Sequence, residues 1–75
     1  MLNNKLAVTM AKHFAARVEK MGTTDAERMT AAVRLAFGRD PTAKERDALV
    51  AYAKEHGLAN ACRVVLNLNE FVFVD

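Results

Sequence analysis

Three side chains of this 75-residue chain could hold a transition metal or act as a nucleophile, namely His13, His56 and Cys62. Zinc sites use ligands at short, characteristic spacings, and the spacing of these three residues matches no zinc pattern. One cysteine alone cannot form an internal disulfide. We therefore predict no metal site and no cofactor site.

The sequence also lacks the residues that nucleophilic or acid–base catalysis requires. It contains no serine, which excludes a Ser-His-Asp arrangement, and its three isolated glycines form no phosphate-binding loop. Cys62 stands one position off an apolar helical stripe, where a small buried hydrophobic residue is expected rather than a reactive thiol. The acidic residues fall at helix starts or on polar faces, where nothing raises a carboxyl pKa for proton transfer. We predict a non-catalytic protein.

Composition indicates one small helical domain spanning residues 1–75. The chain contains fourteen alanines, one tyrosine and no isoleucine or tryptophan, which favours helices over strands. The formal net charge is +2, with eleven basic and nine acidic residues interspersed, as on an ordinary solvated surface. No run of eighteen apolar residues could span a membrane, and the N-terminus lacks the apolar segment of a signal peptide.

Caps and periodicity predict four helices, over residues 4–21, 25–37, 43–56 and 59–70. Thr24 with Glu27, and Thr42 with Glu45, have the spacing of capping boxes. Glycines follow the first three helices, at positions 22, 38 and 57. The predicted inward stripes are Leu6, Met10, Phe14, Val18 and Met21; Met29, Ala32, Val33, Ala36 and Phe37; Ala48, Leu49, Tyr52, Ala53 and His56; and Ala61, Val64, Val65, Leu68, Phe71 and Val72.

Helices 25–37 and 43–56, joined by the sequence GRDPT, have a helix–turn–helix-like outline. The nearby cations Arg34, Arg39, Lys44 and Arg46 make a small nucleic-acid-binding domain an alternative interpretation. Glu45 and Asp47 lie where a recognition helix would approach DNA, and their charges would repel phosphate. Plain helix packing is therefore the favoured interpretation of this segment.

The chain ends on an apolar segment, Phe71 to Asp75. We expect Asn67 and Asn69 to bond helix-end carbonyls or to hold a turn, so that Phe71 and Phe73 dock onto the bundle. The alternative is that the last four residues, VFVD, are extended and add to the edge of a sheet in another domain.

Three motifs resemble segments of one bacterial family. The segment Leu35–Thr42, LAFGRDPT with Glu45 following, is similar to a "LALGRxPTxxE" motif, and the ending VLNLNEFVFVD resembles "LLNxNEFxYVD". The start, from Leu2 to Arg17, is similar to "LNxxFVxxQAxxFAxR". The family is planctomycete-specific domain one. The chain departs from it at Phe73, where the family has tyrosine, and at Lys5 and Leu6, where it has phenylalanine.

The resemblance implies the C-terminal helical part of a longer, multidomain bacterial protein whose natural start lies upstream of Met1. It also implies that the parent protein is exported to the periplasm or outside the cell and often carries a cytochrome-c-like domain. The haem attachment pattern CxxCH is absent here. The leading hypothesis is a non-catalytic structural or protein-interaction module, whose partners are other domains of the parent protein or another protein.

Overall fold

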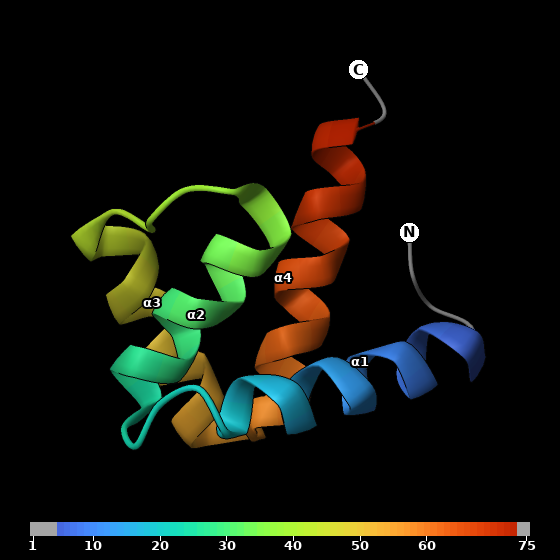
Figure 1. The fold of residues 1–75 in the computed structure, drawn as a ribbon, viewed down its shortest axis with the longest axis horizontal. Coiled ribbons are helices and arrows are strands. Elements are labelled where there is room, and N and C mark those ends of the chain that lie inside the picture. The colour runs from blue at the N-terminus through green and yellow to red at the C-terminus, as the bar shows by residue number, and fades with distance from the viewer. Residues whose placement is uncertain (1–4, 74–75) are drawn as a thin grey trace.

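The computed structural model describes the backbone of residues 5–73 and, within it, the side chains of residues 9–68. Its elements are helices α1 (Lys5–Glu19), α2 (Asp25–Phe37), α3 (Ala43–His56) and α4 (Leu58–Phe73), with no strand in the described part (Figure 1). The all-α prediction is confirmed, and no helix end differs from its predicted position by more than three residues. The Cα radius of gyration, 11.3 Å, is what a compact chain of this length should have, about 11 Å.

Side-chain caps begin α2 and α3, as the sequence predicts. The Thr24 hydroxyl accepts from the Glu27 amide at 3.2 Å, and the Glu27 carboxylate accepts from the Thr24 amide at 3.3 Å. In α3, the Thr42 hydroxyl accepts from the Glu45 amide at 3.1 Å, and the Glu45 carboxylate accepts from the Thr42 amide at 2.8 Å. Each box satisfies amides that the first turn of a helix leaves unpaired, so both helix starts are fixed by local chemistry.

Two glycines are required for different reasons. Gly57 is the only residue between α3 and α4, with φ 93° and ψ 157°, and its amide donates to Ala53 while its carbonyl accepts from Ala61. Gly22 was predicted to end the first helix, but α1 ends at Glu19. Two i→i−3 backbone hydrogen bonds follow, from the Lys20 amide to the Arg17 carbonyl and from the Met21 amide to the Val18 carbonyl. A Cβ at Gly22 would lie 2.6 Å from the Glu27 Cβ, so close approach of the chain requires this glycine.

Helix α4 is the centre of the packing. It contacts all three other helices, α1 crosses its lower end at a steep angle, and α2 and α3 lie along one side (Figure 1). The core combines fully buried side chains from three helices: Val18 of α1, Met29 of α2, and Cys62 and Val65 of α4. Alanines fill much of the rest, which lets the helix backbones approach closely.

The predicted inward stripe of α1 is wrong at its two methionines. Met10 is 46% exposed and Met21 50% exposed, whereas Ala11, Ala15 and Val18 are buried. A four-residue step turns a helix by 400°, so residues spaced by four drift around its surface instead of staying on one line. The side chains of α1 that face the bundle are Ala11, Ala15 and Val18, with Phe14 partly buried against the core. Leu6 lies outside the described side chains.

The stripe of α2 is confirmed, with Met29, Ala32 and Val33 buried and Ala36 and Phe37 packed against the core. The stripe of α3 is confirmed only in part. Leu49 and Ala53 are buried, but Ala48, Tyr52 and His56 are exposed. The Tyr52 and His56 rings lie 4.5 Å apart, centre to centre, one turn from each other on the outer side of α3.

Helix α4 runs further than predicted. The backbone at Asn67 and Asn69 is helical, so neither residue ends the helix, and residues 72 and 73 are helical rather than extended. Asn60 bonds a helix-end carbonyl: its Nδ2 donates to the His56 carbonyl at 2.7 Å. The predicted docking of Phe71 and Phe73 concerns side chains outside the described ones.

Candidate functional site

The described part of the chain contains an apolar groove of about 620 Å³ where α2, α3 and the middle of α4 meet. It is open to solvent on one side, and its size falls within the ~300–1,000 Å³ of typical ligand pockets. Eight of its ten lining residues are apolar or aromatic: Val33, Phe37, Ala48, Leu49, Tyr52, Val64, Val65 and Leu68.

The groove has a buried floor and exposed walls. Val33, Leu49 and Val65 form the floor, with exposures of 3%, 9% and 0%. Tyr52 and Leu68 stand in the walls at 38% and 51% exposure. The floor belongs to the core and is needed for folding, whereas the walls present apolar surface that the rest of the described chain does not cover. That surface could be buried by a partner.

One ion pair closes the polar edge of the groove. The Arg39 guanidinium, in the connector after α2, donates to both carboxylate oxygens of Glu45, at 3.0 and 3.1 Å, and to the Asp40 carbonyl at 3.0 Å. Its central carbon lies 5.5 Å from the centre of the Phe37 ring, within cation–π range. The Arg39 side chain is thus held over the apolar wall by four contacts.

The pair is ionised at neutral pH and has no net charge. The Arg39 guanidinium, followed by the Thr42 amide, lowers the pKa of Glu45 to about 2. The same hydrogen bond raises the pKa of Arg39 above its ordinary value. Because each charge is satisfied by the other, the edge offers no free charge to a phosphate or a metal ion. The groove can select for apolar surface only.

The three residues with metal or nucleophile chemistry do not come together. His13 lies on the exposed side of α1, His56 ends α3, and Cys62 is fully buried in α4. Among the described residues no three His, Cys, Asp or Glu side chains are grouped as metal ligands. Burial raises the pKa of the Cys62 thiol to about 11, so the thiolate is scarce at neutral pH.

The cations of the helix–turn–helix-like outline have acidic neighbours. Arg34 pairs with Asp40, Arg39 with Glu45 and Arg46 with Asp47. Lys44 has no carboxylate partner among the described residues. These pairs neutralise most of the positive charge that a DNA-contacting surface would need on α2 and α3.

The predicted inward stripes contain all eight apolar and aromatic residues of the groove, but the sequence did not identify the groove. Tyr52 and Leu68 were each predicted to face the core, and both are exposed at its edge instead. Periodicity gives the direction of a side chain around its helix but not the distance to the next helix. The sequence contained one signal of the groove. Helices α2, α3 and α4 together have more large apolar side chains than a core of this size can bury.

No helix in the described part of the chain has both the length and the apolar character that crossing a bilayer requires. Comparison with family models, curated proteins and solved structures gave no match in any of the three. Membership of planctomycete-specific domain one therefore stays a prediction.

Proposed function

We propose that this chain is a non-catalytic protein-interaction module whose groove binds the apolar face of a helix from another protein or another domain. The observation that carries the proposal is the groove itself, which has a buried apolar floor, exposed Tyr52 and Leu68 in its walls, and a neutral edge. An amphipathic helix laid in such a groove presents apolar side chains at three- and four-residue steps.

The size of the groove favours a segment over a second folded copy of the chain. A standard interface uses about 20–30 residues and buries about 800 Å² on each partner. The groove is lined by ten residues, and the chain exposes 5,078 Å² in total. A dimer would have to recruit a large further surface, whereas one helix of a few turns contacts about as many residues as the groove offers.

The charges favour an apolar, uncharged contact. Arg39 and Glu45 satisfy each other at the edge, and among the described side chains no other charged one lines the groove. A phosphate or an acidic segment would have to break a bidentate ion pair to gain one of its own. A leucine-rich face would bury Leu68 and Tyr52 and leave the pair intact.

The experiment measures binding of a fluorescent, uncharged amphipathic peptide of about 18 residues, with leucines at helical spacing and glutamines elsewhere. Leu68→Lys should weaken binding about tenfold, because the half-exposed leucine loses about 1–1.5 kcal/mol of further burial. Leu35→Lys is the matched control, since Leu35 is 39% exposed but does not line the groove.

Equal effects of the two substitutions would refute the assignment of the groove. Concentration-dependent self-association that Leu68→Lys abolishes would identify a second copy as the occupant and would refute the proposed helix partner. Both variants should retain the helical circular dichroism of the unmodified chain.

A further inference from the structure

The charge of this protein is unevenly distributed among its helices. Residues 5–20 contain four of the eleven Lys and Arg residues and one of the nine acidic residues, Glu19. The rest of the chain carries seven basic and eight acidic residues. Positive charge is therefore concentrated on α1, although basic and acidic residues are interspersed along the chain as a whole.

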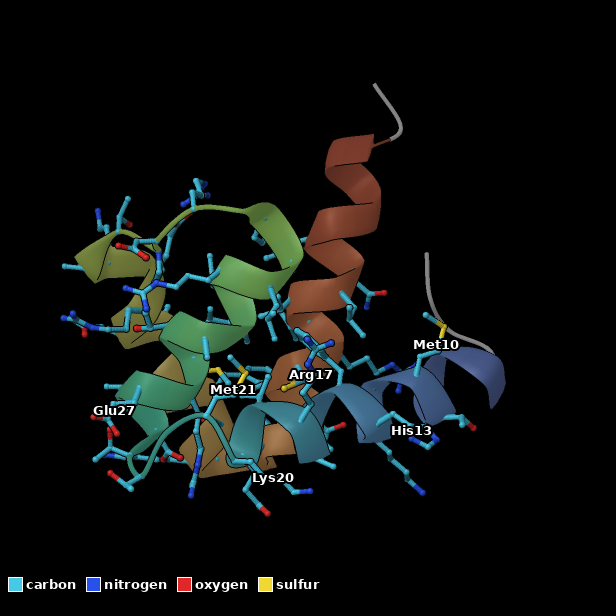
Figure 2. The ribbon with its side chains drawn as sticks, in the orientation of Figure 1. Met10, His13, Arg17, Lys20, Met21 and Glu27 are labelled. Atoms are coloured by element: carbon cyan, nitrogen blue, oxygen red, sulfur yellow. The ribbon has the colours of Figure 1, made fainter. Side chains whose placement is uncertain are left out.

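The structure places part of this charge on one line. Met10, His13, Arg17 and Lys20 follow each other at steps of three, four and three residues, and Met21 comes directly after them. We call these five residues the α1 stripe; all five are exposed, and Figure 2 draws Met10, Arg17 and Met21 above the α1 ribbon and His13 and Lys20 below it. At 1.5 Å per residue the stripe is about 15 Å long.

The cations of the α1 stripe differ from the arginines of α2, of α3 and of the connector between them, and resemble Lys44 and Lys54 of α3, which have no carboxylate partner among the described side chains. Arg28, Arg34, Arg39 and Arg46 each pair with a carboxylate. No carboxylate partner is found for Arg17 or Lys20 within the described side chains. Glu19, which precedes Lys20 in the chain, forms no ion pair among the described side chains, and the Glu27 carboxylate (Figure 2) accepts from Thr23 and Thr24 in the cap of α2.

Apolar surface accompanies this charge. Met10, at one end of the stripe, is 46% exposed, and Met21, at the other end, is 50% exposed. Methionine is flexible and polarisable and adapts to varied apolar partners. A surface with unpaired cations in the middle and methionines at both ends is complementary to acidic side chains flanked by apolar ones.

We infer that the α1 stripe is a second docking surface, which binds an acidic amphipathic segment of a partner protein. This inference goes beyond the groove and does not depend on it. A lipid surface fits less well, because the apolar face of α1, with Ala11, Ala15 and Val18, is already buried in the bundle and cannot insert. A nucleic-acid backbone offers phosphates but nothing apolar to cover the two methionines.

The test uses an acidic amphipathic peptide of about 18 residues, with leucines at helical spacing and glutamates beside them. Arg17→Glu/Lys20→Glu should weaken its binding about tenfold at low salt, since two attractive pairs become repulsive. Lys44→Glu/Lys54→Glu on α3 changes the net charge equally and should leave binding within about twofold. Far-UV circular dichroism establishes that both variants are folded.

A second pair of measurements tests the apolar part and the class of partner. Met10→Gln/Met21→Gln, which leaves the charge unchanged, should weaken binding about threefold or more. Duplex DNA and vesicles of phosphatidylserine with phosphatidylcholine should bind more weakly than the peptide at equal salt. The inference is overturned if the α1 and α3 charge reversals act equally, if the methionine variant binds unchanged, or if DNA or vesicles bind as tightly as the peptide. Binding that Leu68→Lys abolishes would place the peptide in the groove and would also overturn it.

Discussion

Exchange of Met29 for alanine should destabilise the protein strongly, whereas the same exchange at Met10 or Met21 should not. Met29 is fully buried among α1, α2 and α4, while Met10 and Met21 are about half exposed. Removing a buried methionine side chain costs about 2–5 kcal/mol, the lost transfer energy plus the energy of the cavity left behind. Substitutions at exposed positions usually stay within about 0.5 kcal/mol.

The magnitude matters because the whole domain is small. At about 0.05–0.15 kcal/mol per residue, 75 residues give a free energy of unfolding of about 4–11 kcal/mol. Met29→Ala would therefore remove between about a fifth and all of the total. With a urea slope of about 1 kcal/mol/M, its unfolding midpoint should fall by about 2 M or more.

The assay is urea unfolding followed by circular dichroism at the helix band, with all three alanine variants measured side by side. If Met29→Ala is too unstable to fold, Met29→Leu still tests the site, because a volume-conserving exchange should cost less than about 1.5 kcal/mol. The reasoning is refuted if Met10→Ala costs as much as Met29→Ala. That result would mean that α1 turns its large side chains inward, as its four-residue periodicity suggested.

Three further predictions concern the cysteine, the ion pair and a glycine. Cys62 should react with iodoacetamide at pH 8 only after the protein is unfolded in denaturant, because the thiol is fully buried and its pKa is raised to about 11. Rapid labelling of the folded chain would contradict this prediction. The pKa of Glu45 falls on folding from 4.5 to about 2, so its contribution to stability is complete above pH 4.5 and is lost as the pH falls toward 2. Glu45→Gln should make the free energy of unfolding, measured with urea, less dependent on pH between about 4.5 and 2. An unchanged dependence would show that the pair with Arg39 does not form. Gly22→Ala should lower stability by about 1–3 kcal/mol through the contact with the Glu27 Cβ, and a neutral effect in thermal unfolding would mean that the two residues lie further apart.

The helices of this fold were predictable because local chemistry fixes them. Thr24 and Thr42 are followed three residues later by glutamate, and both capping boxes form as the spacing requires. Gly38 has the left-handed conformation, φ 72°, that ends α2. These features depend on a few neighbouring residues, so the sequence contains the whole interaction.

The candidate surfaces were not predictable in the same way, because they depend on how the helices meet. Tyr52 and Leu68 have the spacing of core residues, but they line the groove and stay 38% and 51% exposed. The α1 stripe emerges only when the exposure of Met10 and Met21 is known and when Arg17 and Lys20 are seen to have no carboxylate partner among the described side chains. Pairing and exposure are tertiary properties, and a single sequence does not encode them in adjacent residues.

The most direct test of the proposed function is to map where the uncharged amphipathic peptide binds, by amide chemical shifts of the isotope-labelled protein during a titration. The largest shifts should fall on groove residues of all three helices, such as Phe37, Tyr52 and Leu68, and should disappear in Leu68→Lys but not in Leu35→Lys. Shifts that are absent, or that fall outside the groove and persist in Leu68→Lys, would contradict the proposal that this groove binds a partner helix.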